Sequence, residues 1–282
     1  MKSFTLKLLS LMLVCFMLLP MLFACGEEET PPSSNPPTND KLSQFEAMSE
    51  KDKAIYILTT DYDDNGKISG DMKLSLSCNY MGYAISAIVS GKTVQIDADG
   101  TYVDYTESTM SMTMAGQSQV STSKSGYIDG KEFSYVEVDG VGQGEYSATT
   151  KEDYIANKDD EDQDTVDDFG LTKDNCQTIT CSKNSQGSWV ATYTDVTEEG
   201  LAEFKELLAS FEGLISADDL VDVVVTLTVS STLQPMGVKV AFEFSGENPP
   251  VLTLDATYAI GNDVEVPDID FSTFTDKSAP NL

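Results

Sequence analysis

The sequence has 282 residues, with 47 acidic residues, 17 basic residues and no histidine, for a formal net charge of −30. Such a charge repels nucleic acid and anionic lipid headgroups. All the basic residues are lysine, so the chain lacks Ser-His-Asp and Cys-His triads, His-bound zinc and bidentate arginine clamps. Carboxylate-pair or Ser-Lys chemistry is formally open, but no motif marks either one. We therefore predict a protein that is not an enzyme and carries no cofactor.

The first residues read as an export signal. Lys2 and Lys7 precede an apolar run over residues 8–23, which is short for a membrane span. The run ends in LFAC, residues 22–25, which resembles the lipobox of bacterial lipoproteins. That resemblance implies diacylglyceryl transfer to the Cys25 sulfur and then cleavage before it, which leaves two acyl chains, such as palmitate, on Cys25. The alternative is an ordinary signal peptide with a chance cysteine.

The expected domain organisation follows from this start. Residues 1–24 would be the signal, residues 25–40 a Pro- and Ser-rich disordered tether, residues 41–272 a single domain and residues 273–282 a tail. Two acyl chains on Cys25 would hold the mature protein firmly on the extracytoplasmic face of the cell membrane. We expect a monomer with this membrane anchor and no nucleic-acid partner.

A helix is predicted over residues 43–61, where apolar residues recur at helical spacing. It leads into DYDDNGKISGD, residues 61–71, which has the order of an EF-hand calcium loop. The position of the bidentate glutamate is Met72, and no exiting helix follows. An acidic Asp-Asn-Gly turn into a strand is the simpler interpretation, with weak calcium binding as the alternative, and we assign no metal ligands.

In the rest of the first half, apolar and polar residues alternate with a period of two, which predicts an antiparallel meander. A long strand is expected over residues 68–80. Tight turns are expected at Ser90-Gly91, Asp99-Gly100 and Asp129-Gly130. Met110, Met112 and Met114 would share one face of a strand.

The acidic stretch over residues 151–170 interrupts the strands, with a short helix at its beginning and then an exposed loop. After it we predict two short strands, a helix over residues 197–215, three long strands, and a short strand at Val264–Pro267. Cys78, Cys176 and Cys181 allow at most one internal disulfide, between Cys78 and either partner, or else remain buried free thiols.

This order of elements resembles the lipoprotein families with the LolA/LppX-type fold, including uncharacterised members from Gram-positive bacteria. The similarity covers about residues 42–271. It is strongest over residues 231–268, where alternating strands end in Val-x-Val-Pro, and the GYIDGKEF hairpin at residues 126–133 also fits. The resemblance implies an α+β fold, in which a strongly curved antiparallel sheet forms an incomplete β-barrel with helices packed on its concave side.

The resemblance also implies that a lipid or acyl chain is held against the apolar side of the sheet. The candidate lining residues are Met110, Met112, Met114, Phe242 and Phe244. Methionine rows adapt well to flexible ligands, although methionine on a strand is also common in ordinary cores. We therefore expect a surface lipoprotein that binds an apolar ligand. The alternatives are a tethered acidic interaction module of the cell envelope and a weakly calcium-dependent surface protein.

Overall fold

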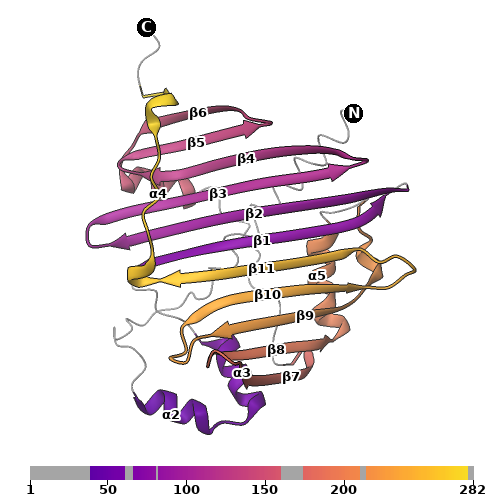
Figure 1. Ribbon diagram of the computed structural model, residues 1–282. Helices are drawn as coiled ribbons and strands as arrows, with labels where there is room; N and C mark the ends of the chain where they lie inside the picture. The colour runs from indigo at the N-terminus through magenta and orange to yellow at the C-terminus, as the bar shows by residue number, and fades with distance from the viewer. Residues whose placement is uncertain (1–38, 61–65, 81, 160–173, 210–213, 279–282) are drawn as a thin grey trace.

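The computed structural model describes residues 39–60, 66–80, 82–159, 174–209 and 214–278. These residues form one open sheet of twelve strands, in the order β12-β6-β5-β4-β3-β2-β1-β11-β10-β9-β8-β7 (Figure 1). The first six strands are β1 (Lys67–Tyr80), β2 (Tyr83–Ala98), β3 (Thr101–Met114), β4 (Gln117–Ile128), β5 (Lys131–Val138) and β6 (Val141–Ala148). The other six are β7 (Cys176–Lys183), β8 (Trp189–Val196), β9 (Leu220–Val229), β10 (Pro235–Phe244), β11 (Val251–Ile260) and β12 (Thr275–Asp276).

The described part of the chain also holds four α-helices, which are α2 (Asn39–Ala47), α3 (Glu50–Thr59), α4 (Lys151–Asp159) and α5 (Glu198–Ala209). The expectation of an α+β fold, with helices filling an incomplete barrel, is wrong. Strands dominate, β7 and β12 end the sheet without pairing to each other, and the sheet is mixed because β12 runs parallel to β6. The architecture is closer to all-β. The α+β expectation came from the family resemblance, and the twelve strands outweigh the four short helices that the described residues form.

Two-residue turns connect the strands of the first half. Asp99 and Gly100 have φ values of 56° and 77°, and Asp129 and Gly130 have values of 51° and 73°. Positive φ at both central residues matches the right-handed twist of the flanking strands, and glycine adopts it at little cost. The turns predicted at these two Asp-Gly pairs are therefore confirmed.

The turn predicted at Ser90-Gly91 is wrong, because β2 runs through both residues and pairs with β1 and β3 without a break in register. What changes near this point is the side of the strand that carries the buried apolar side chains. Before it, Ile85, Ala87 and Val89 are buried, and after it Val94 and Ile96 are buried. Because successive side chains point to opposite faces, the two sets lie on opposite sides of the sheet.

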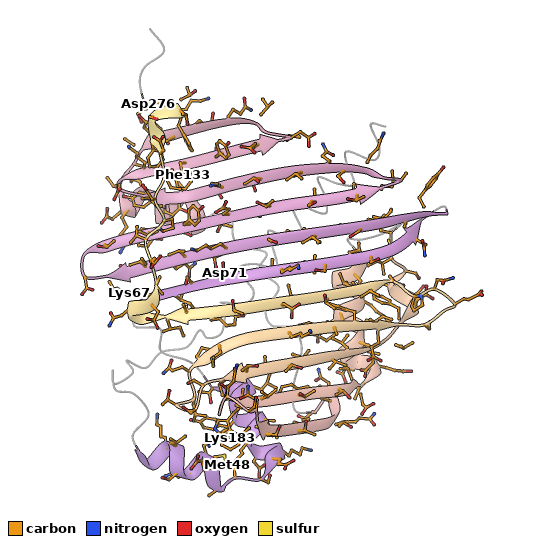
Figure 2. The ribbon with its side chains drawn as sticks, viewed as in Figure 1. Met48, Lys67, Asp71, Phe133, Lys183 and Asp276 are labelled. Carbon is orange, nitrogen blue, oxygen red and sulfur yellow. The ribbon has the colours of Figure 1, made fainter. Side chains whose placement is uncertain are left out.

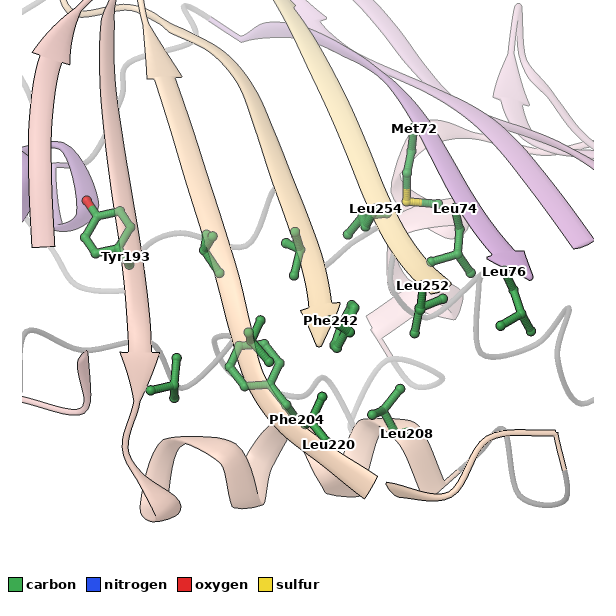
Figure 3. Close-up of a cluster of buried hydrophobic side chains, with 14 of the residues drawn as sticks. Met72, Leu74, Leu76, Tyr193, Phe204, Leu208, Leu220, Phe242, Leu252 and Leu254 are labelled. Atoms are coloured by element: carbon green, nitrogen blue, oxygen red, sulfur yellow. The ribbon is translucent and has the colours of Figure 1, made fainter. Parts of the chain in front are cut away.

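The structure therefore has two hydrophobic cores, one on each face. The main core lies on the face that carries Val89 and Met110, and it extends across the sheet to β7 (Figure 3). The second core joins Val94, Ile96 and Phe133 to the segment after β11 on the opposite face. A sheet with apolar residues on parts of both faces needs a cover on each side.

Helices α2, α3 and α5 contribute to the main core. Ser49 accepts a hydrogen bond from the Asp52 amide and caps α3, so the single helix predicted over residues 43–61 is divided in two. The Tyr193 hydroxyl on β8 donates to the Ala54 carbonyl at 2.6 Å. Phe204 of α5 meets Phe242 of β10 edge-on, with ring centroids 6.0 Å apart.

The segment after β11, residues 261–278, crosses the opposite face as a strap (yellow in Figure 1). Val264–Pro267 is not a strand, so that prediction is wrong; the strap reaches the sheet edge only at β12, beside β6. Phe274 stacks on Tyr135, with centroids 5.7 Å apart. A Cβ atom at Gly144 would lie 2.7 Å from the Phe274 ring, so the strap needs glycine at this position of β6. Thr275 and Asp276, which the sequence analysis assigned to the tail, thus pair with β6 as part of the sheet.

Replacing Phe133 with alanine should lower the free energy of unfolding by about 3–5 kcal/mol, the usual cost of removing a buried aromatic ring. Phe133 is 3 % exposed, and its ring contacts Tyr105, Phe271 and Phe274. Urea unfolding measures the change. Val141→Ala on β6, where the side chain is 80 % exposed, is the control and should shift stability by less than about 0.5 kcal/mol. Equal effects of the two substitutions would contradict the second core.

Candidate ligand-binding face

The predicted lining residues all lie in or against the main core. Met110, Met112, Phe242 and Phe244 are buried, and Met114 is half-buried against them. The structure places them in two groups. The methionines are on β3, whereas the phenylalanines are on β10, where Phe242 already contacts Phe204 of α5.

Between the two groups, the strand register aligns apolar side chains from β11 to β3. Leu254 pairs with Leu74, Leu74 with Val89, and Val89 with Met110. A second row runs from Leu252 on β11 to Met112 on β3 (Figure 3 labels Leu74, Leu76, Leu252 and Leu254). We call the combined surface the apolar band, and its members are Leu74, Leu76, Cys78, Ile85, Ala87, Val89, Met110, Met112, Met114, Leu252 and Leu254.

The described helices lie mainly over the other half of this face. Helix α3 packs on β7, β8 and β9, and α5 packs on β9. Phe204 and Leu208 of α5 point toward Leu220 and Phe242, near the ends of the strands (Figure 3). Helix α4 lies at the far end of β3 and β4, where Tyr154 reaches Asp104 and Tyr127. Thus, within the described residues, no helix makes its main contacts with the β1–β3 part of the apolar band.

A group of small hydroxyl side chains adjoins the apolar band on the same face. The register places Ser108 beside Gly91 and Ser123, and Thr93 beside Gly70 and Thr106. We call Thr93, Thr106, Ser108, Ser121 and Ser123 the hydroxyl patch. Five polar or charged residues are buried in the described structure, and four of them, Thr93, Asp104, Ser108 and Ser121, lie on this face of β2, β3 and β4.

The hydroxyl groups of the patch differ in whether they have a hydrogen-bond partner. Ser108 and Ser123 share a hydrogen bond with Oγ atoms 3.0 Å apart. In contrast, Thr93 is 8 % exposed, and its Oγ1 atom has no hydrogen-bond partner among the described residues. Buried polar atoms are nearly always paired, so this hydroxyl needs an explanation.

Sequence reasoning missed the hydroxyl patch because it interpreted Ser90-Gly91 as a turn, which separated Thr93 from the Met110 row. The patch could have been found from the length over which side chains at odd-numbered positions of this strand continue to share one face. Thr93 continues the odd-numbered positions of Ile85, Ala87 and Val89 without interruption. An extended strand through Gly91 would have placed the hydroxyls on the same face as the methionines.

The strands place acidic side chains but no lysine on this face near the hydroxyl patch, and Lys151 of α4, at the end of the face, is paired with Asp97 at 2.7 Å. All the lysines of β1 to β6 are at positions that alternate to the opposite face, namely Lys67, Lys73, Lys92, Lys124 and Lys131. Asp104 lies on the face of the hydroxyl patch and accepts a hydrogen bond from Tyr154 at 3.0 Å. Burial, followed by the negative charge of Asp104, raises the pKa of the Tyr154 hydroxyl far above its usual range.

Several sequence predictions fall outside the described residues. Cys25 and the signal lie in residues 1–38, the first part of the calcium-like loop is in residues 61–65, and most of the acidic stretch is in residues 160–173. In the described chain, Met72 is a buried residue of β1, and no group of three or more metal-ligating side chains converges. No helix of the described residues combines the length and hydropathy of a membrane span.

Neither the family models nor the curated proteins include a match to this chain. The resemblance to the LolA/LppX-type lipoproteins therefore stays a prediction. Functional inference rests on the apolar band, the hydroxyl patch and the sequence features at the N-terminus.

Cys78, Cys176 and Cys181 are free and buried. Burial raises the pKa of the Cys78 thiol, and burial together with the charge of Asp222 raises the pKa of Cys176 to about 11. Because these folded-state pKa values lie above the ordinary value of 9.0, the unfolded chain loses thiol protons first as pH rises.

The free energy of unfolding should therefore be unaffected by these thiols below pH 9 and should fall as pH rises from 9 toward 11. Urea unfolding at pH 8, 9.5 and 10.5 measures the change. Cys176→Ala removes one of the three groups and should make the decline shallower. A stability that is constant or increases over this range would contradict the burial of the thiols.

Proposed function

We propose that this protein is a lipoprotein, anchored through Cys25 to the extracytoplasmic face of a cell membrane, that binds an acyl chain along the apolar band. The observation that supports the binding function is the aligned rows from Leu252 and Leu254 to Met110 and Met112, on the half of the face that lies away from α3 and α5. The N-terminal charge pattern, apolar run and LFAC motif support the anchor.

The chemistry of the apolar band suits a flexible hydrocarbon. Leucine, valine and methionine side chains offer no directional bonds, so an acyl chain gains free energy through the area it removes from water, about 25 cal/mol per Å². Met110, Met112 and Met114 have unbranched, polarizable side chains that adjust to chains of different shape. A polar ligand would lose its hydration there without compensation.

Native mass spectrometry of the chain purified from its own host should detect a retained acyl lipid. Met112→Glu should abolish retention, because it places a charge in the apolar band. Ser111→Glu is the matched control, since the adjacent residue of β3 points to the opposite face and should leave retention intact. Circular dichroism of each variant verifies folding, and Met114→Glu, at a half-buried position, provides a second test if Met112→Glu does not fold.

Repeated absence of any lipid from the folded wild-type chain would contradict the binding function. It would favour instead a tethered acidic module that contacts cationic parts of the cell envelope, as the 47 acidic residues would permit. Loss of lipid from both Met112→Glu and the control Ser111→Glu would indicate a general disturbance of the sheet rather than a binding face.

The anchor is tested separately by metabolic labelling with radioactive palmitate. The wild-type chain should incorporate label into the membrane fraction, and Cys25→Ser should lose both the label and cleavage of the signal. Cys15→Ser, which changes the other cysteine of the first 25 residues, should leave both unchanged. Labelling that survives Cys25→Ser would contradict the lipobox interpretation.

A further inference from the structure

We propose that the hydroxyl patch binds the uncharged, hydroxyl-bearing head of an acyl lipid whose chain lies along the apolar band. This inference rests on the proposed function and specifies its ligand: a neutral lipid such as an acylglycerol, in preference to a fatty acid or an anionic phospholipid. Four observations carry it, and each concerns a different property of the site.

The first observation is the Thr93 hydroxyl. Its Oγ1 atom is buried and has no hydrogen-bond partner among the described residues. Leaving such a group unpaired costs free energy, whereas a ligand oxygen beside it would accept or donate a hydrogen bond. Thr93 lies on the face of Val89 and Met110, since it continues the same alternating positions of β2.

The second observation is the size of the neighbours. Thr93 pairs with Gly70 on β1 and with Thr106 on β3, and the adjacent row has Gly91 beside Ser108. Two glycines without side chains therefore border the Thr93 hydroxyl on this face. Both glycines are buried in the structure, so a head group held at this position would lie directly against the backbone of the sheet and be shielded from water.

The third observation is the charge. The five lysines of β1 to β6 alternate to the opposite face, while Asp104 lies in the row beyond Thr106 on the face of the patch. A carboxylate or phosphate head would approach the buried Asp104, while Lys151 of α4, at this end of the face, is already paired with Asp97 at 2.7 Å. That approach is unfavourable at low dielectric. A neutral head that bears hydroxyl groups meets no such cost.

The fourth observation is the spacing. Thr93 is four residues from Val89 on one strand, or about 13 Å at the usual rise of about 3.3 Å per residue. Ser108 and Ser123 occupy the row between them on β3 and β4, and Ser121 pairs directly with Met110. The polar and apolar parts of the face thus adjoin, and a single amphipathic molecule can contact both.

The experiment uses the full chain, kept in solution by an amphipathic polymer so that no detergent micelle competes for the ligand. Three probes share one acyl chain and differ in the head: 1-monodecanoylglycerol, methyl decanoate and decanoate. Isothermal titration calorimetry should rank the glycerol ester about 3- to 10-fold tighter than the methyl ester, the gain expected from one net hydrogen bond, with decanoate weakest.

Thr93→Val should remove the preference for the glycerol ester and leave the affinity for the methyl ester unchanged. It should not lower the melting temperature, because an unpaired hydroxyl contributes nothing to the fold. Thr109→Val is the matched control, since the Thr109 hydroxyl lies on the opposite face of β3, 3.0 Å from that of Thr122. This control should lower the melting temperature by about 2–4 °C and keep the preference.

The alternative outcomes are distinct. If Thr93→Val unfolds the chain or lowers its melting temperature as Thr109→Val does, the hydroxyl has a structural partner and the inference is overturned. If all three probes bind equally, or decanoate binds most tightly, the inference fails while acyl-chain binding stands. If no probe binds the folded chain, the proposed function fails as well.

Discussion

The alternation of side chains along β2 is the constraint on which the arrangement of the sheet depends. β2 has 16 residues in unbroken register with β1 and β3, so its odd and even positions must face opposite sides throughout. Its apolar residues change from odd to even positions between Val89 and Val94. One strand therefore contributes to both cores, and each face of the sheet needs its own cover.

The two covers differ in kind. On the main-core face, α3 and α5 pack over β7, β8 and β9, and the apolar band continues beyond them. On the opposite face, the strap supplies Phe271 and Phe274, whose rings pack edge-on with centroids 5.4 Å apart. Helices conceal a broad surface, whereas a strap follows a narrow line and leaves the polar side chains on either side in contact with water. This difference explains why the larger apolar surface, and the candidate site, lie on the helical side.

Much of the sheet could be predicted because local rules decide it. Met72, Leu74 and Leu76 alternate with polar residues, and the Asp-Gly pairs can adopt positive φ, so strands and turns followed from neighbouring residues alone. The methionine row was placed on the correct strand for the same reason. In contrast, Gly91 is compatible with either a turn or a strand, and only its pairing with Met72 and Ser108 decides between them. The hydroxyl patch and the strap depend on such distant pairings, so the sequence pattern could not reveal them.

The position of β1 in the sheet has a consequence for how the chain folds. β1 is hydrogen-bonded to β2 on one side and to β11, close to the other end of the sequence, on the other. The strands β1 to β6 form one meander of local hairpins, and β7 to β11 form a second antiparallel set. Their junction requires closure of a loop of well over a hundred residues, a slow step compared with forming each hairpin. The apolar band extends across this junction, so the proposed binding surface is complete only in the last stage of folding.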